Sequence, residues 1–415
     1  MTLDSERRDV AVTQTTLNHG MGSALSYFDN GQDAVQEQPF DPSTVYAIPR
    51  IDIPLDESDK RYAKCFTSDQ TTELSEFFRE YGFVVIRDVL TEDECRASID
   101  ELWTFLESRG YKLREWDGPT EHEKQMDEER PPARIRRDDP STWDNDWPPM
   151  GHAGILGYLP VFRKQVLQNR QNPKIYSAFA TLMQRQDLLV NQGRLGMFRP
   201  TRVKDEPDTI NQKWKTAYSL HWDLNPWRYS LDDAIFLRDA KKHQKESQQQ
   251  LTYEEPCDFI KENSEIGSEK DGSINVQGLI NFADNQVEDG GFQIVVGCHH
   301  HMAKWADSCK ESMGVRMRRR TLVKVDCDDP LYGQPQRVAM RAGSMVIWDQ
   351  RMAHGSAPND SCNPRMCQFI KVLPAYSGTS QARNRARVVQ QKVAEAKGFE
   401  ATDLGNRLFG LAEWS

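Results

Sequence analysis

The sequence lacks any long apolar run. None of its hydrophobic stretches approaches the ~20 residues that a membrane-spanning helix needs. Residues 1–15 also lack the apolar core of a secretion signal, and the acids among them argue against a transit peptide. We therefore predict a cytoplasmic protein without a membrane span.

Paired cysteines and an excess of positive charge are lacking as well. The eight cysteines are scattered and form no CxxC motif, which favours reduced thiols over a disulfide framework or a zinc site. The formal net charge is −10, with 53 Lys and Arg against 63 Asp and Glu. Nucleic acids and anionic membranes favour basic partners, so this charge argues against a general binder of either. The oligomeric state stays open.

The chain is long enough to bury a full core. Its 415 residues, 38% of them hydrophobic, suffice for one large or two modest domains. Residues 1–45 are polar with little periodicity and predict a flexible arm. We expect the main domain over residues 46–376, and residues 377–415 predict a C-terminal helical extension packed on it.

Local patterns predict the first elements of that domain. Apolar residues between 74 and 81 fall at helical spacing, and Gly82 is a suitable C-terminal stop. Residues 83–86 are apolar and mostly β-branched, which indicates a strand. Thr91 with Glu94 has the pattern of a capping box that opens a second helix.

Turn and cap signals continue along the chain. Asn172 and Pro173 predict a helix start, and residues 188–373 alternate short apolar runs with Gly, Asn and Asp turns, which predicts a β-sandwich. Residues 289–291 (Asp-Gly-Gly) predict a hairpin between two strands. Residues 225–275 form a hydrophilic insertion, either a substrate lid, a partner-binding loop or a tolerated insert.

The candidate chemistry begins at His221 and Asp223. The flanking apolar and aromatic residues predict a strand, on which residues two apart face the same side. His354, 131 residues after Asp223, offers a second imidazole. Two histidines and one carboxylate on one face form the facial triad typical of non-haem Fe(II) oxygenases. Each of these residues alone is more often an ordinary hydrogen-bonded side chain.

Arg365 strengthens the metal interpretation. It lies eleven residues after His354, across the turn-rich segment 357–361, so we expect two neighbouring strands with Arg365 opposite His354. A guanidinium grips a carboxylate with two hydrogen bonds. A metal triad beside an arginine suggests a dicarboxylate cosubstrate that spans the two.

Two basic clusters are weaker candidates. Consecutive side chains of His299, His300 and His301 diverge on a strand or a helix, so we expect a helix start or surface there rather than a metal site. Residues 316–320 hold four arginines, for which a strand face and an anionic substrate group are both open.

With these residues in view, the sequence resembles the phytanoyl-CoA dioxygenase-like family of Fe(II)/2-oxoglutarate-dependent oxygenases. Beyond the triad and the arginine, three phrases resemble that family, in the right order and within about residues 68–376. They are 77–90 (FFREYGFVVIRDVL), 288–299 (EDGGFQIVVGCH) and 343–356 (GSMVIWDQRMAHGS). The chain departs from the family at Val296 and Cys298, where Pro and Ser are usual, and in its long insertion.

The resemblance implies a mainly β fold with flanking helices, around a double-stranded β-helix (jelly-roll, cupin-like) core. It implies that His221, Asp223 and His354 bind Fe(II), with 2-oxoglutarate and O2 as cosubstrates. It further implies that Arg365 holds the far carboxylate of 2-oxoglutarate. By the same resemblance, three more residues belong to the cosubstrate site: Ser356, Leu279 and Asn281.

The resemblance also bears on the reaction. Halogenases of the family lack the carboxylate that Asp223 provides here, so hydroxylation, desaturation or demethylation of a small-molecule or lipid-like substrate is favoured. Four aromatic residues are candidates for the substrate pocket or for the core: Tyr218, Trp222, Phe282 and Trp348. Two alternatives stay open, a non-catalytic jelly-roll binding module with a vestigial metal site and a cupin-type metalloenzyme without 2-oxoglutarate.

Overall fold

A computed structural model gives the arrangement of most of the chain. The described residues are 39–108, 135–145, 147–148, 151–156, 159–191, 193–203, 206–229, 276–317, 322–375 and 380–414. They belong to one compact unit, residues 36–415. Nearly all of the predicted arm and of the predicted insertion lies outside the described residues, so their proposed roles stay predictions.

The strands form two main sheets and one small one. The larger sheet has the order β1-β2-β12-β8-β14-β3, with β4 also paired to β14, and the smaller has the order β10-β7-β13-β9-β11. Strands β5 and β6 form a separate pair. The bounds are β1 Cys65–Phe66, β2 Phe83–Ile86, β3 Leu188–Val190, β4 Leu195–Phe198, β5 Arg202–Val203, β6 Glu206–Ile210, β7 His221–Trp222, β8 Val276–Asn281, β9 Gly291–Ile294, β10 Val323–Lys324, β11 Gln336–Arg337, β12 Met345–Asp349, β13 His354–Ala357 and β14 Arg365–Pro374.

The path of the chain makes this a double-stranded β-helix. From β7 onward the chain crosses repeatedly between the sheets: β7, then β9 to β11, and β13 lie in the five-stranded sheet, whereas β8, β12 and β14 lie in the larger one. The pairings along this path are antiparallel. The predicted jelly-roll core is confirmed.

The same alternation overturns two local predictions. The Asp-Gly-Gly segment 289–291 is not a hairpin turn, because β8 pairs with β12 and β14 while β9 pairs with β11 and β13. Gly290 and Gly291, at φ 81° and 101°, instead carry the chain from one sheet to the other. Strands β13 and β14 also lie in different sheets, so the prediction that Arg365 lies opposite His354 on a neighbouring strand is wrong.

Most helix predictions are confirmed at their ends. Helix α1 stops at Gly82 in the left-handed region (φ 78°), and the backbone and side-chain bonds of a capping box join Thr91 and Glu94 at the start of α2. Asn172 caps α5 through the Lys174 amide. The helix bounds are α1 Thr71–Tyr81, α2 Glu92–Glu107, α4 Lys164–Arg170, α5 Pro173–Met183, α8 Met302–Ser308, α9 Val315–Met317, α10 Ser380–Glu395 and α11 Asp403–Leu408.

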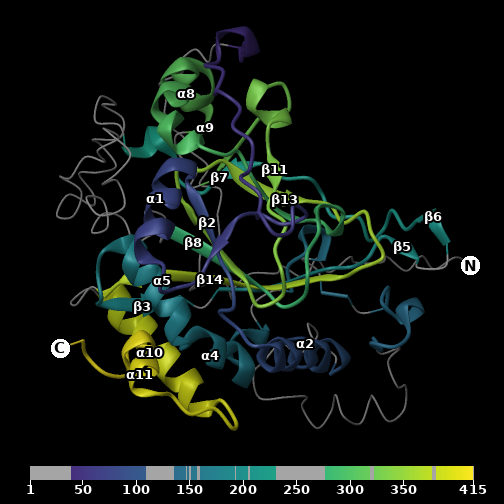
Figure 1. Ribbon diagram of the computed structural model, residues 1–415, viewed down its shortest axis with the longest axis vertical. Helices are drawn as coiled ribbons and strands as arrows, with labels where there is room; N and C mark the ends of the chain where they lie inside the picture. The colour runs from purple at the N-terminus through teal and green to yellow at the C-terminus, as the bar shows by residue number, and fades with distance from the viewer. Residues whose placement is uncertain are drawn as a thin grey trace, which may run out of the picture. The chain divides into compact units, whose positions relative to one another are not determined.

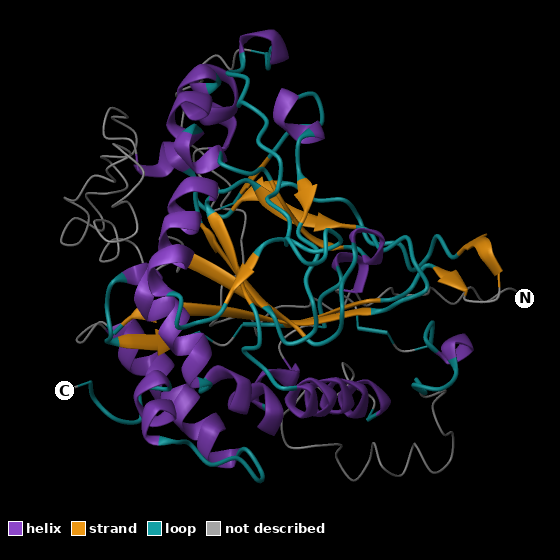
Figure 2. Ribbon diagram, in the orientation of Figure 1, coloured by secondary structure: helices purple, strands orange, loops and turns teal. Residues whose placement is uncertain are grey.

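Helices cover the outer face of the larger sheet (Figures 1 and 2). A Cβ at Gly278 of β8 would lie 2.9 Å from the Phe179 ring of α5. From β14, the Gln368 amide donates to the Val166 carbonyl of α4 at 3.1 Å. Because this face is taken by helices, the opposite face of the sheet is the one that meets the five-stranded sheet.

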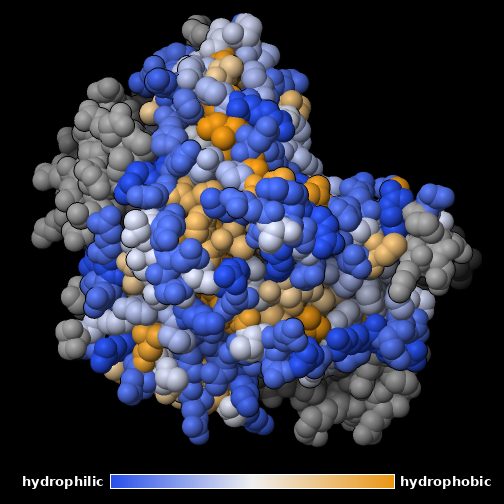
Figure 3. All heavy atoms as spheres, in the orientation of Figure 1, coloured by the Kyte–Doolittle hydropathy of each residue, from blue (hydrophilic) through white to orange (hydrophobic). Residues whose placement is uncertain are grey.

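One face of the molecule shows how its side chains are distributed. The face in Figure 3 carries mostly hydrophilic side chains, with apolar ones gathered toward its middle. None of the described helices is long and apolar enough to cross a bilayer.

Candidate metal centre

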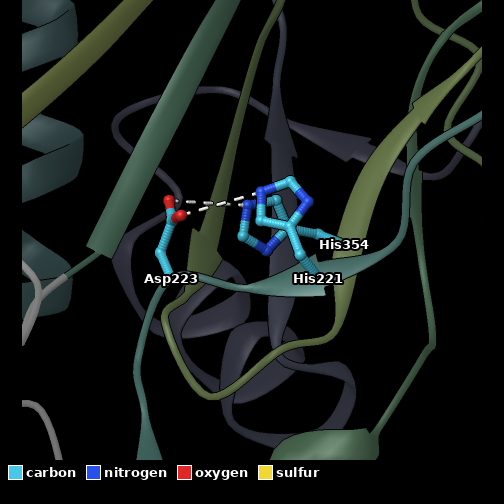
Figure 4. A group of neighbouring side chains, drawn as sticks. All are labelled: His221, Asp223 and His354. Atoms are coloured by element: carbon cyan, nitrogen blue, oxygen red, sulfur yellow. Dashed lines mark ion pairs between the residues drawn. The ribbon is translucent and has the colours of Figure 1, made fainter. Parts of the chain in front are cut away.

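Three side chains from the two sequence-predicted segments lie together (Figure 4). One ligand atom each from His221, Asp223 and His354 lies within 4.8 Å of the others. The Nε2 atoms of His221 and His354 lie 3.6 and 3.8 Å from the carboxylate oxygens of Asp223. His221 and His354 are direct partners across β7 and β13, and their ring centroids are 4.6 Å apart. The spacing leaves room for one shared ion.

The protonation states suit metal binding. Burial lowers the pKa of His354 to about 4 and also lowers that of His221, so both imidazoles are neutral near pH 7. Burial raises the pKa of Asp223, but the interactions with the two histidines and a hydrogen bond from Gln277 outweigh it and bring the pKa to about 2. Two neutral nitrogens and one carboxylate are a donor set that fits Fe(II).

Hydrogen bonds hold two of these groups in place. His354 Nδ1–H donates a hydrogen bond to the Met352 carbonyl at 2.9 Å. This bond leaves the Nε2 lone pair facing Asp223. The Gln277 amide donates to Asp223 Oδ2 at 2.7 Å. Gln277 was not among the site residues predicted from the sequence. A signal existed, because Gln277 shares the period-two face of β8 with Leu279 and Asn281.

The Arg365 side chain is buried and unsatisfied. It is 1% exposed, and none of its three guanidinium nitrogens has a hydrogen-bond partner among the described residues. The guanidinium carbon lies 5.0 Å from the Phe198 ring centroid. On the other side, a Cβ at Gly291 would come within 2.1 Å of Arg365 Nε. A buried cation without a partner is costly, so the site fits an anionic group such as a carboxylate.

The three other residues predicted for the cosubstrate lie on the strands around this space. Asn281 is fully buried with both amide atoms unpartnered among the described residues, and it pairs in register with Cys367, two residues after Arg365. Leu279 is buried one period-two step along the same face. Ser356 lies two residues after His354 on β13 and is partly buried.

The four candidate pocket residues are placed differently. Trp348 lies beside the triad, with its ring centroid 5.2 Å from that of His354 and its buried indole nitrogen unpartnered among the described residues. Phe282 is buried in the core. Tyr218 is 36% exposed and donates to the Tyr332 carbonyl.

Trp222 takes the second of its two predicted places, the core. It is fully buried, and its ring packs 4.1 Å from that of Trp305 in α8. Because it stands between His221 and Asp223, strand alternation sends its side chain to the opposite side. This placement argues against a substrate-pocket role for Trp222.

The two basic clusters gain no metal role. His299 and His300 end a 3-10 turn (Cys298–His300), and His301 is the residue before helix α8. The Nε2 atoms of His299 and His300 bond to the Arg79 and Glu80 carbonyls of α1. Arg316 lies in helix α9 rather than on a strand and pairs with Asp326, while residues 318–320 lie outside the described residues.

Comparison with known proteins points to one family. The sequence profile of the family described as Phytanoyl-CoA dioxygenase (PhyH) matches residues 268–367. A Dictyostelium discoideum protein named "Putative phytanoyl-CoA dioxygenase" is 33% identical over 344 residues, which is 81% of this chain and 86% of that protein.

Two solved structures are among those that match the chain. The GlcNAc Inducible Gene 2 protein of Candida albicans has a TM-score of 0.50 at 14% identity, over 83% of this chain and 77% of that one. The epimerase SnoN of nogalamycin biosynthesis, solved with Fe3+ and alpha ketoglutarate, has a TM-score of 0.37 at 12% identity, over 74% and 84% of the chains.

Family membership also settles the cofactors, because the phytanoyl-CoA dioxygenase family uses Fe(II), 2-oxoglutarate and O2. The extent and identity of the Dictyostelium match carry the conclusion that this chain belongs to the phytanoyl-CoA dioxygenase family of Fe(II)/2-oxoglutarate-dependent oxidoreductases.

Proposed function

We propose that this protein is a dioxygenase that hydroxylates, desaturates or demethylates a C–H bond of a small-molecule or lipid-like substrate. His221, Asp223 and His354 would hold the Fe(II), and Arg365 would hold the far carboxylate of 2-oxoglutarate. When bound, the iron and 2-oxoglutarate would supply the electrons that activate O2 for the oxidation of a C–H bond. The residues of the chain hold these groups in place and exclude water from the site.

The observation that carries the proposal is the meeting of His221, Asp223 and His354 within 4.8 Å of one another. His354 lies 131 residues after Asp223, so the fold has to bring them together. Their neutral imidazoles and ionised carboxylate are a fitting donor set. The unpartnered Arg365 guanidinium adds a fitting receptor for a second carboxylate.

The other residues would act around this centre. Asn281 and Ser356 are candidates for further hydrogen bonds to 2-oxoglutarate, since Asn281 is buried without a described partner. Leu279 would close the apolar side of that space. Trp348, beside His354, is the aromatic residue that we keep as a wall of the substrate pocket. The seven described cysteines are free thiols, which supports a cytoplasmic, reducing compartment.

Anaerobic addition of Fe(II) and 2-oxoglutarate tests the proposal. We expect a weak visible charge-transfer band, which His354→Ala and Asp223→Ala should abolish. If the wild-type protein takes up no metal and shows no band, the non-catalytic binding module is favoured instead. A variant that kept full activity without one of the three ligands would rule out the ligand set.

A second experiment addresses the substrate. A metabolite extract is incubated with enzyme, Fe(II), 2-oxoglutarate and O2, and mass spectrometry follows the products. We expect a product heavier by one oxygen atom for hydroxylation, or lighter by two hydrogens for desaturation. Loss of the product in His354→Ala ties it to this site.

A further inference from the structure

Trp222 stands between two of the proposed metal ligands but points away from the metal. Its indole N–H donates to the Arg351 carbonyl at 2.9 Å, inside the core. Arg351 belongs to the loop 350–353 that leads into His354. One buried hydrogen bond therefore joins the segment that carries His221 and Asp223 to the segment that carries His354.

Cys298 holds the same loop from a third segment. Its Sγ accepts a hydrogen bond from the Ala353 amide at 3.0 Å, and its thiol donates toward the Arg351 carbonyl at 3.7 Å. Cys298 is fully buried, and burial raises its thiol pKa to about 12, so the group stays a neutral thiol that can donate and accept at once.

The loop passes this order on to His354. The Met352 carbonyl accepts from His354 Nδ1 at 2.9 Å, and the Ala353 carbonyl accepts from the Val295 amide at 3.0 Å. Met352 and Ala353 are fully buried. A shift of the loop would move the acceptor that fixes the imidazole tautomer and its direction.

We infer that Trp222 and Cys298 are positioning residues, which fix the distance between the His221–Asp223 segment and the His354 loop through the Arg351 carbonyl. This inference rests on the proposed function of the site. It gives Trp222 a task that a pocket residue does not have. It also gives a task to Cys298, one of the departures from the family pattern.

Plain core packing is the competing account, and Trp305 separates the two. Trp305 is as buried as Trp222, packs against it at 4.1 Å, and also spends its indole N–H on a buried acceptor, Asp329 Oδ2 at 3.0 Å. It has no bond to the His354 loop among the described contacts. If packing alone matters, Trp222→Phe and Trp305→Phe should behave alike.

The test measures the dissociation constant for Mn(II), a redox-stable probe, by anaerobic calorimetry on the full chain, together with the melting temperature. We expect both variants to lower the melting temperature by a similar amount. Trp222→Phe should also weaken Mn(II) binding about tenfold, whereas Trp305→Phe should leave the Mn(II) affinity nearly unchanged. Equal Mn(II) affinities in the two variants would overturn the inference.

A second pair keeps the test valid if Trp222→Phe does not fold. Cys298→Ser retains a donor and an acceptor and should bind Mn(II) much as the wild type does, whereas Cys298→Ala should bind it about tenfold more weakly. Equal binding by these two contradicts the inference. Failure of the proposed function looks different, since His354→Ala would then bind Mn(II) as well as the wild type.

Discussion

The site has a metal end, at His221, Asp223 and His354, and an arginine end, at Arg365 and Asn281, and the two differ in how many polar groups already have protein partners. At the metal end, His354 and Asp223 already have protein partners, the Met352 carbonyl and the Gln277 amide. At the other end, the nitrogens of Arg365 and both amide atoms of Asn281 are buried without partners among the described residues. The groups of the metal end thus have partners within the chain itself, whereas under the proposed function 2-oxoglutarate would complete the arginine end.

Energetics explain why the two ends differ. Burying polar atoms without hydrogen bonds costs a few kcal/mol, and an unpaired buried charge costs more. Such unpartnered groups are expected where a bound ligand supplies the missing hydrogen bonds. Under the proposed function, the Arg365 end would destabilise the free protein and gain its partner when 2-oxoglutarate binds, while the metal end would hold its ligands in place before metal arrives.

The largest effect is expected from Arg365→Met. It removes the cation that would grip the far carboxylate, so 2-oxoglutarate should bind ~100-fold more weakly while Mn(II) binding changes little. The free protein should gain on the order of 1 kcal/mol in unfolding free energy, because an unpaired buried charge is gone. Calorimetry and urea unfolding measure the two effects. Unchanged 2-oxoglutarate affinity would refute the role of Arg365.

Gln277→Leu tests the metal end. Loss of the donor to Asp223 Oδ2 should weaken Mn(II) binding about tenfold and leave the intrinsic 2-oxoglutarate contact at Arg365 intact. Gln368→Leu is the control, since this amide, which is fully buried where Gln277 is partly buried, bonds to α4 on the outer face of the sheet. Calorimetry that finds equal Mn(II) affinities for the two variants removes Gln277 from the account.

Gly291→Ala perturbs the arginine end without touching its charge. The new Cβ would meet Arg365 Nε, so the guanidinium must move and 2-oxoglutarate affinity should fall by roughly fivefold. Gly343→Ala is the control: it has a similar positive φ of 71° and a Cβ clash of its own, with the Leu90 carbonyl. Both should lose stability, but only the first should lose cosubstrate affinity. Equal 2-oxoglutarate affinities in the two variants would contradict the prediction that a Cβ at position 291 displaces the Arg365 guanidinium.

The smallest effect concerns the turn behind the metal end. Burial lowers the pKa of His299, next to Cys298, to about 3, whereas an unfolded histidine has a pKa near 6.5. Between these values the unfolded chain binds more protons, so the free energy of unfolding should fall as the pH drops from about 6.5 toward 3. Urea unfolding measured across this pH range should show that the free energy of unfolding depends less steeply on pH in His299→Gln than in the wild type. An unchanged pH dependence would contradict the lowered pKa of His299.

The sequence predicted the parts of the fold that local patterns control. Gly82, the Thr91–Glu94 capping box and the Asn172 cap all lie where the chain predicted them, because these signals act within a few residues. Sheet membership was missed at two places. The turn residues at 289–291 and 357–361 look alike whether a strand returns beside its neighbour or crosses to the facing sheet.

The candidate site divides in the same way. The sequence indicated His221, Asp223 and His354, because the two-residue period of a strand and the family resemblance are both properties of the sequence alone. Gln277 and the Trp222–Arg351 link were missed because they depend on which strands face each other. Strand alternation turns half of the side chains on each strand away from the site, so the sequence left Trp222 open between the substrate pocket and the core.

A crystal structure of the protein with Mn(II) and 2-oxoglutarate, grown without oxygen, is the most direct test of the account. It should show one ion bound by His221, Asp223 and His354 in nearly their present positions, and the far carboxylate of 2-oxoglutarate on the Arg365 guanidinium. An ion held elsewhere, or Arg365 paired with a protein carboxylate while the cosubstrate lies apart from it, would contradict the account.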